Sequence, residues 1–352
     1  MNKPKYLLAW IFCCLLLVGC GMNKKQDTAI PYNSNVEAFT TGKISRFSPV
    51  YLLLNRDVDS ARMTADVLKK HLKLTPETEG TFAFENNRTV VFRPAKEFKR
   101  DTEYRVKVDM SGFFEVNPED REFSFSFSTY GLALRANLNS LDVNKENENG
   151  YDVSITLFTP DKEERTAIEP LLRFSENVTT AWQQSADGKR HELMLSNIPS
   201  GSERERNLVL AVASNKQGVE EKDLLSVTIP GMNDFSVYDI AFVAEPERYI
   251  EATFTKRLDE NQQMEGLAYV EGNSSGIVSV SGNKLRLYPD ANPKGNVNVH
   301  LSSDIRSKSG LTLKEPVVKQ ISLSESAPLV RFIGEGVVIP QSTELTIPFE
   351  AI

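Results

Sequence analysis

Few residues of this chain have the types and spacing that catalysis needs. Gly272-Asn273-Ser274-Ser275-Gly276 matches the G-x-S-x-G pattern of a nucleophilic serine. Such a serine needs a strand before it, a helix after it, and an acid and a histidine further along, because a strained turn must expose its hydroxyl to the base. Residues 277–280 alternate in the manner of a strand instead. We therefore expect a polar hairpin loop here and no catalytic Ser274.

Residues that bind metals are equally sparse. The three histidines, His71, His191 and His300, fall in three different predicted domains, and HExxH, CxxC and glycine-rich phosphate loops are absent from the sequence. Glu146 and Glu148 lack the spacing of a calcium loop, so a solvated loop tip is favoured over calcium binding. No pattern places two acids on facing walls of a cleft, as glycoside hydrolysis requires. We expect a non-enzyme without metal or cofactor.

Cys20 is the residue with the most specific covalent chemistry. Two lysines, Lys3 and Lys5, precede an apolar run over residues 6–18, and Gly19 separates that run from Cys20. This is the pattern of a signal peptide, and the run is shorter than the roughly 20 residues of a membrane-spanning helix. Its end resembles a lipobox, which implies cleavage after Gly19 and a diacylglyceryl group on the Cys20 thiol. The alternative is a plain signal peptide in which Cys20 is incidental.

Cysteine usage and charge narrow the class of protein further. All three cysteines lie within the first 20 residues, so an exported chain would hold no disulfide and would depend on core burial alone. A catalytic cysteine or thiolate metal site is excluded from the body for the same reason. The net charge is −7, and removal of Lys3 and Lys5 makes it −9, so nucleic acid is not an expected partner.

The expected location is the cell envelope, with the membrane as a partner through the lipid on Cys20. Gly21 follows Cys20, where an Asp would resemble the signal for inner-membrane retention in some bacteria. We therefore expect the outer membrane, on either its periplasmic or its surface side.

Short alternating apolar runs, separated by Gly, Asn, Asp and Pro, dominate the chain after residue 42 and predict an all-β protein of tandem antiparallel sandwich domains. Residues 20–42 are polar, lack a sustained period and predict a flexible tether. The predicted units are the signal peptide 1–19, the lipidated tether 20–42, sandwiches at 43–129, 130–230 and 234–323, and an incomplete further domain at 327–352.

The first sandwich shows the pattern most clearly. A hairpin is predicted in which Phe82 and Phe84 lead into a turn, and Val90 and Phe92 lead out of it. The turn contains Asn86-Asn87, which suits positive φ. Alternation at 50–54, 104–108 and 123–127 predicts further strands, and residues 59–72 suit a short amphipathic helix.

The third sandwich repeats the order of elements in the first. A strand at 278–280, a tight turn at 281–284, a strand at 285–289 and a strand at 296–299 follow the same sequence of strand, turn and strand as residues 82–108. The closing residues 327–352 read as strands that cannot enclose a core of their own. Either they begin a further domain of a longer protein or they pair with the domain before them.

Two sets of residues carry a resemblance to known families. Ser45-Arg46-Phe47-Ser48-Pro49, Arg88 to Pro94 and Asp101-Thr102-Glu103-Tyr104 resemble the SbsA-type bacterial Ig-like domain. Lys256-Arg257-Leu258-Asp259, residues 280–285 and residues 328–340 resemble the amino-terminal region of bacterial alpha-2-macroglobulin-family lipoproteins, particularly of the Bacteroidetes kind.

The resemblance implies tandem Ig-like or macroglobulin-like domains that frame a protease trap. In that family a bait region is cleaved by the attacking protease, and many members capture it with a Cys-x-Glu-Gln thioester. No cysteine follows Cys20, so the thioester is absent here, and a bait region would lie beyond Ile352. The expected function is a non-catalytic, lipid-anchored scaffold, with proteases as partners only through a downstream region. The alternative is a free-standing Ig-like lipoprotein that binds protein or glycan, for which Trp182 is the single candidate platform outside the signal peptide.

Overall fold

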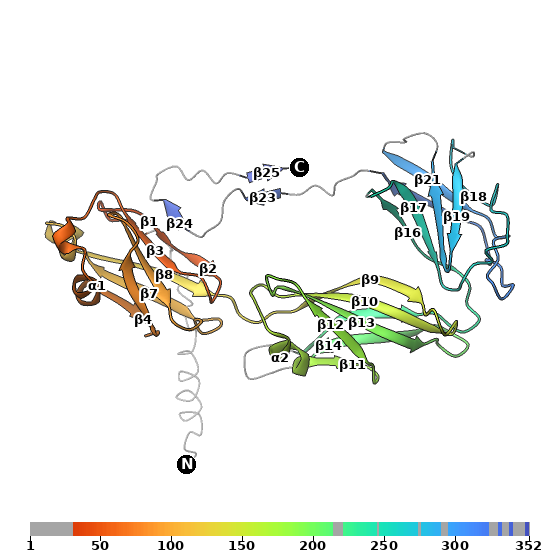
Figure 1. Ribbon diagram of the computed structural model, residues 1–352, viewed down its shortest axis with the longest axis horizontal. Helices are drawn as coiled ribbons and strands as arrows, with labels where there is room; N and C mark the ends of the chain where they lie inside the picture. The colour runs from red at the N-terminus through yellow and green to blue at the C-terminus, as the bar shows by residue number, and fades with distance from the viewer. Residues whose placement is uncertain are drawn as a thin grey trace, which may run out of the picture.

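The computed structural model describes residues 31–213, 221–244, 246–273, 276–289, 295–323, 330–332, 338–340 and 349–351. Gly19, Cys20, Ser274 and Ser275 lie outside these residues. The described chain forms three β-sandwiches that follow one another in sequence order, coloured from red to blue in Figure 1. The predicted all-β class of tandem sandwich domains is confirmed. Among the described helices, none is long and apolar enough to cross a bilayer.

Two sheets enclose the core of the first sandwich. One sheet has the order β1-β3-β6-β5, and the other has the order β2-β8-β7-β4. The strands of the first sheet are β1 (Val36–Thr40), β3 (Val50–Leu54), β6 (Thr89–Pro94) and β5 (Gly80–Phe84). Those of the second are β2 (Gly42–Ile44), β8 (Glu122–Thr129), β7 (Glu103–Asp109) and β4 (Leu72–Thr75).

The second and third sandwiches each contain seven strands in two sheets. The second consists of β9 (Arg135–Val143), β10 (Gly150–Phe158), β11 (Leu172–Phe174), β12 (Thr180–Gln184), β13 (Arg190–Pro199), β14 (Arg206–Val212) and β15 (Lys222–Ile229). The third consists of β16 (Val237–Val243), β17 (Tyr249–Phe254), β18 (Ala268–Val270), β19 (Ile277–Ser281), β20 (Lys284–Tyr288), β21 (Asn296–Leu301) and β22 (Val317–Ser322).

All three sandwiches have the same topology. In each, the first, second, fifth and fourth strands form one sheet, and the third, sixth and seventh form the other, as in the constant-type immunoglobulin fold. The first sandwich adds β2, which pairs with β8 in parallel. The predicted repeat of the first domain in the third is therefore confirmed, and it extends to the second.

The alternating residues of these strands form three separate cores. Phe123, Phe125 and Phe127 on β8 are buried between the sheets of the first sandwich, as their spacing predicts. Tyr104 is the second residue of β7, and its hydroxyl accepts a hydrogen bond at 3.0 Å from the backbone N–H of Lys99. A tyrosine at this place that bonds to the backbone upstream is a feature of immunoglobulin-like domains.

The predicted tether is wrong over residues 36–42, because these residues belong to the first sandwich. Strand β1 pairs with β3, and Phe39 is 1% exposed with its ring 5.5 Å from that of Phe123. The polar residues around β1 conceal a single short buried strand. Pairing with β3 and contact with the opposite sheet, neither of which is local in sequence, decide its structure.

The predicted hairpin forms between β5 and β6, but its turn differs from the expected one. Val90 and Phe92 are buried, and Phe82 and Phe84 are half-buried against the same core. The positive-φ turn at Asn86-Asn87 is wrong, since neither residue has positive φ. Instead, the side-chain oxygen of Asn86 accepts hydrogen bonds from the backbone N–H groups of residues 88 and 89, each at 2.9 Å. A side-chain acceptor thus replaces the strained backbone.

The helix predicted within residues 59–72 is shorter than expected. Helix α1 (Ala65–His71) begins at a cap in which Thr64 accepts from the backbone of Val67, and Leu68 is its buried residue. Leu72 already belongs to β4, because pairing with Val108 of β7 extends the backbone there.

The hairpin expected around Ser274 is also wrong. Strand β18, before this loop, belongs to one sheet of the third sandwich, and β19, after it, belongs to the other. The described strands on either side of Ser274 and Ser275 therefore do not pair with each other, because β18 pairs with β21 and β19 pairs with β20.

The closing strands do not pair with the third sandwich in any described ladder. Strand β23 (Val330–Phe332) pairs with β25 (Phe349–Ala351). Strand β24 (Val338–Pro340) pairs with β1 of the first sandwich, at the edge of its sheet. Of the two alternatives, pairing with the preceding domain is therefore not observed among the described residues. A free edge on β1 accounts for the observed partner, because an edge strand presents unpaired backbone groups.

Candidate functional site

The junctions between consecutive sandwiches hold the most elaborate polar contacts between separate parts of the described chain. At the first junction, residues 159–163 of the second sandwich form a loop that contacts the first sandwich. We call this the acidic loop because Asp161 and Glu163 outnumber its single cation, Lys162. It lies directly after β10, and Thr159 fixes its shape by donating from its hydroxyl to the carbonyl of Asp161 at 2.8 Å.

Asp161 contacts the backbone of the first sandwich. Its Oδ2 accepts a hydrogen bond from the backbone N–H of Arg46 at 2.8 Å, and its Oδ1 accepts one from the hydroxyl of Ser45 at 2.6 Å. Both residues lie between β2 and β3, where a turn closes with a bond from the N–H of Ser48 to the carbonyl of Ser45. The carboxylate is 1% exposed, so these bonds replace water around the charge.

Glu163 accepts from two arginines of the first sandwich. The Arg46 guanidinium donates to its Oε1 at 3.3 Å, and the Arg100 Nε donates to the same oxygen at 3.1 Å. Arg100 also pairs with Oε2 through its terminal nitrogen. Glu163 is 3% exposed and Arg46 is 7% exposed. We call these four side chains, Arg46, Arg100, Asp161 and Glu163, the ionic clasp.

The second junction uses the equivalent loop of the next sandwich. Residues 255–257 follow β17 directly, as the acidic loop follows β10, and contact residues 144–151 of the second sandwich. Arg257 donates to the carbonyls of Asn144 at 2.9 Å and Lys145 at 2.6 Å. The hydroxyl of Tyr151, which is 1% exposed, donates to the carbonyl of Thr255 at 2.7 Å. Burial raises the pKa of Tyr151 to about 12, so this donor keeps its proton.

Lys256 is the charged residue that packs most deeply into this second junction. It is 7% exposed, and its ammonium lies 5.6 Å from the centre of the Tyr151 ring. Burial lowers the pKa of Lys256, against the opposing effect of Asp234 and Glu148. Its charge is held by a ring face and not by a paired carboxylate, unlike the charges of the ionic clasp. Two ion pairs, Lys308 with Glu148 at 2.7 Å and Lys284 with Asp142 at 3.2 Å, border the same junction.

The histidines considered as metal ligands lie in three separate sandwiches and are not brought together. His71 lies 3.4 Å from Asp109, and His300 stacks on Tyr269 at 4.8 Å between ring centres. His191 is fully buried, and this burial lowers its pKa. Within the described residues, no three His, Cys, Asp or Glu side chains gather closely enough to hold a metal ion.

Trp182, the predicted binding platform, packs into its own domain. Its ring is half-buried against the second core, with the guanidinium of Arg165 at 5.5 Å from the ring centre and the His191 ring at 5.5 Å. The most exposed aromatic residue described is Tyr32, at 79%, and other exposed apolar side chains are scattered over separate elements. These positions do not form an aromatic binding face.

Sequence reasoning missed the ionic clasp. In the sequence, the segment Ser45-Arg46-Phe47-Ser48-Pro49 is distinctive only for its resemblance to a family, and Asp161 and Glu163 lie in an ordinary charged stretch. One feature of the sequence could have indicated the clasp. Residues 159–163 directly follow the second strand of the second sandwich, and residues 255–257 directly follow the second strand of the third. Comparison of these loops would identify them as junction loops.

No protein-family model matches the chain, and no curated protein matches its sequence. Solved structures with which it shares similarity include the extracellular cadherin domains 3–6 of protocadherin gamma B2, at 12% identity over 88% of this chain and 83% of that chain, with a TM-score of 0.23. The D1–D4 ectodomain fragment of ICAM-5 matches at 12% identity over 85% and 79%, with a TM-score of 0.24. An L,D-transpeptidase from Mycobacterium smegmatis matches at 13% identity over 52% and 78%, with a TM-score of 0.21. These scores carry no argument about function.

The ionic clasp predicts a large effect of neutralising one buried carboxylate. Glu163→Gln removes the shared counter-charge of Arg46 and Arg100, so we expect the free energy of unfolding to fall by about 3 to 5 kcal/mol. Hydrogen exchange of the backbone amides in the first two sandwiches of the whole chain, followed over a range of denaturant concentrations, measures this loss. Asp101→Asn is the matched control, because it breaks the exposed Lys43–Asp101 pair and should cost less than about 1 kcal/mol. Equal losses in the two variants would contradict the role of the clasp.

Proposed function

We propose that this protein is a non-catalytic, lipid-anchored scaffold whose linked Ig-like domains hold their carboxyl-terminal end at a set distance from a membrane. The observation that carries the proposal is the repeated junction, in which the loop after the second strand of one sandwich packs on the loop before the second strand of the preceding sandwich. Buried charges and backbone hydrogen bonds at such a junction oppose free rotation of the domains. A fixed arrangement of this kind suits a spacer.

The geometry also supports a fixed direction along the array. The acidic loop meets arginines of the first sandwich, whereas residues 255–257 bring basic side chains to the second. Because the two loops carry opposite charge, neither junction accepts the other's loop without bringing like charges together. The order of the domains is therefore specified by charge as well as by covalent sequence.

Anchorage at the membrane is part of the proposal and rests on the sequence. The lysines, apolar run and Gly19-Cys20 at the start of the chain support acylation of Cys20 after export. We place the protein in the cell envelope, at the outer membrane.

The resemblance to alpha-2-macroglobulin-family lipoproteins supports a more specific role within this proposal. The chain would be the amino-terminal part of an endopeptidase inhibitor, and would position a bait region located further along. A free-standing binding lipoprotein is the second candidate, but the packing of Trp182 against Arg165 and His191 does not favour it.

Acylation is tested by substitution of the modified residue. We expect Cys20→Ala to abolish incorporation of an alkyne fatty acid during growth, because only the thiol of Cys20 accepts the diacylglyceryl group. Cys13→Ala/Cys14→Ala is the matched control, since both residues lie in the segment that is removed, and it should be labelled as wild type. Undiminished label in Cys20→Ala would contradict the anchor.

The scaffold role predicts that these domains alone do not inhibit proteases. Residues 21–352 contain no cysteine to form a thioester, and the resemblance places the bait region beyond Ile352. We expect trypsin to retain its full activity on a protein substrate in a molar excess of this chain. Stoichiometric loss of that activity, or a covalent trypsin adduct on a denaturing gel, would show that inhibition resides in these domains.

A further inference from the structure

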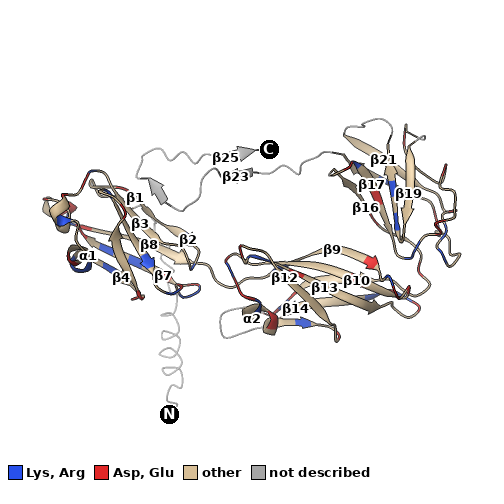
Figure 2. Ribbon diagram, viewed as in Figure 1, with Lys and Arg blue, Asp and Glu red and all other residues tan. Residues whose placement is uncertain are grey.

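The outer face of the sheet formed by β4, β7 and β8 places three basic side chains side by side, with Glu103 at one end of their row on β7 and Asp109 and Glu122 at the other. Lys73 on β4 lies directly opposite Lys107 on β7, and Arg105 lies one step further along the same face of β7. The next strand places Ser124 opposite Lys107 and Ser126 opposite Arg105. We call these five residues the basic face. Figure 2 shows the blue of Lys and Arg on strand β7.

Like charges directly opposite each other destabilise an antiparallel pair. The basic residues of the basic face have no ion-pair partner among the described residues, and the one side-chain bond described for them runs from the Arg105 Nε to the Ser126 hydroxyl at 3.4 Å. Several other basic side chains of this sandwich are paired with carboxylates. Examples are Lys43 with Asp101, Arg88 with Asp57, Arg93 with Glu85, Lys96 with Glu79 and Arg121 with Asp109. An unpaired group of three cations in an acidic protein points to an anionic ligand.

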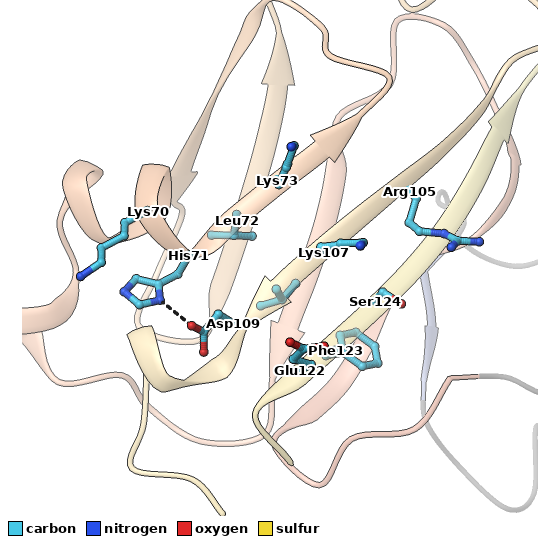
Figure 3. Close-up of a pocket in the computed structure, with 11 residues that line it drawn as sticks. Lys70, His71, Leu72, Lys73, Arg105, Lys107, Asp109, Glu122, Phe123 and Ser124 are labelled. Atoms are coloured by element: carbon cyan, nitrogen blue, oxygen red, sulfur yellow. Dashed lines mark ion pairs between the residues drawn. The ribbon is translucent and has the colours of Figure 1, made fainter. Parts of the chain in front are cut away.

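The basic face is hollowed at one end. A cavity of about 500 Å³ opens there, and Figure 3 shows Lys73, Lys107 and Arg105 along it with the hydroxyl of Ser124 beside them. Hydroxyls and cations together suit the oxygens of a phosphate group, which accept hydrogen bonds and carry charge.

Two carboxylates close the far end of this hollow. Asp109 lies 3.4 Å from His71 and 3.3 Å from Arg121. Burial acts to raise the pKa of Asp109, but hydrogen bonds from Ser111 and Arg121 outweigh it and hold the pKa well below its ordinary value. Asp109 is therefore anionic, and with Glu122 opposite it on β8 it confines an anion to the rows of Lys73 and Arg105.

The chain enters the first sandwich beside this hollow. The Asn33 side chain donates to the carbonyl of Asp120 at 2.9 Å, and the Ser34 hydroxyl donates to the Asp120 carboxylate at 2.7 Å. Asp120 is two residues before Glu122, which lines the hollow. The eleven residues 20–30 span at most about 40 Å even when fully extended, so an anchor on Cys20 would keep the start of the first sandwich within about that distance of the bilayer.

We propose that the basic face binds the phosphate headgroups of anionic lipids and lays the first sandwich against the membrane. This proposal relies on the anchor of the proposed function for its location, but the binding itself needs no acyl group. Each basic residue near an anionic bilayer strengthens binding by a factor of about five. Three such residues bind weakly alone, and tethering supplies the high local concentration that makes weak binding effective.

The test uses residues 20–352 with Cys20→Ser, which carry no lipid, in co-sedimentation with vesicles. We expect binding to phosphatidylcholine vesicles that contain phosphatidylglycerol, loss of that binding in high salt, and no binding to phosphatidylcholine alone. Lys73→Glu/Lys107→Glu should bind at least about thirtyfold more weakly. Lys189→Glu/Arg190→Glu, exposed on the second sandwich with the same change in charge, should bind as the parent does.

Several results would overturn the proposal. Equal binding by the two charge-reversal variants would remove the basic face from the interaction, as would equal binding to the two kinds of vesicle. Binding to dextran sulfate without binding to vesicles would identify a soluble polyanion as the ligand instead. Lys73→Gln/Lys107→Gln is a milder change at two exposed side chains and should leave the fold intact. It should show a loss of vesicle binding between that of the parent and that of the charge-reversal variant. Fatty-acid labelling of Cys20 decides the anchor separately, so the two failures are distinguishable.

Discussion

The buried contact between Glu163 and two arginines is the interaction on which the arrangement of the first two domains depends. Two charges this deeply buried are stable only in each other's presence, because each loses the water that would otherwise surround it. The geometry that pairs Glu163 with Arg46 and Arg100 also fixes Asp161 on the backbone of residue 46. A change in the angle between the sandwiches would break all of these contacts together. The clasp therefore provides orientation more than net stability.

The two junctions solve one geometrical problem with different chemistry. Each uses the loop after the second strand, but the first buries a network of carboxylates and guanidinium groups, whereas the second buries the Tyr151 ring, the Lys256 stem and backbone hydrogen bonds. Placing one cation over a ring removes fewer charges from water than burying a full ion-pair network. It also constrains the orientation of the two domains less, because a ring face is less directional than a set of hydrogen bonds. On this basis the first junction, nearer the proposed anchor, is the more tightly specified of the two.

The fold could be predicted from the sequence to a large extent, because alternation of Phe123, Phe125 and Phe127 reports burial directly. Strand β1 escaped prediction, since its neighbours are polar and its structure depends on pairing with β3. The Asn86 turn was misjudged because an amide side chain can replace positive φ. Neither the ionic clasp nor the basic face could be predicted, because both bring together residues from separate elements: Arg46 meets Glu163 only after two domains dock, and Lys73 faces Lys107 only in one register.

The central claim, that the junctions hold the domains in a fixed relation, is tested most directly by a distance distribution across the first junction. Thr81 and Ala181 are exposed on β5 and β12, and with Cys20→Ser no native thiol remains after the signal peptide, so cysteines at these two positions accept spin labels selectively. Double electron–electron resonance on this protein should give one narrow distribution, which broadens when Glu163→Gln is added. A broad distribution in the protein with Glu163 intact, unchanged by Glu163→Gln, would contradict the account.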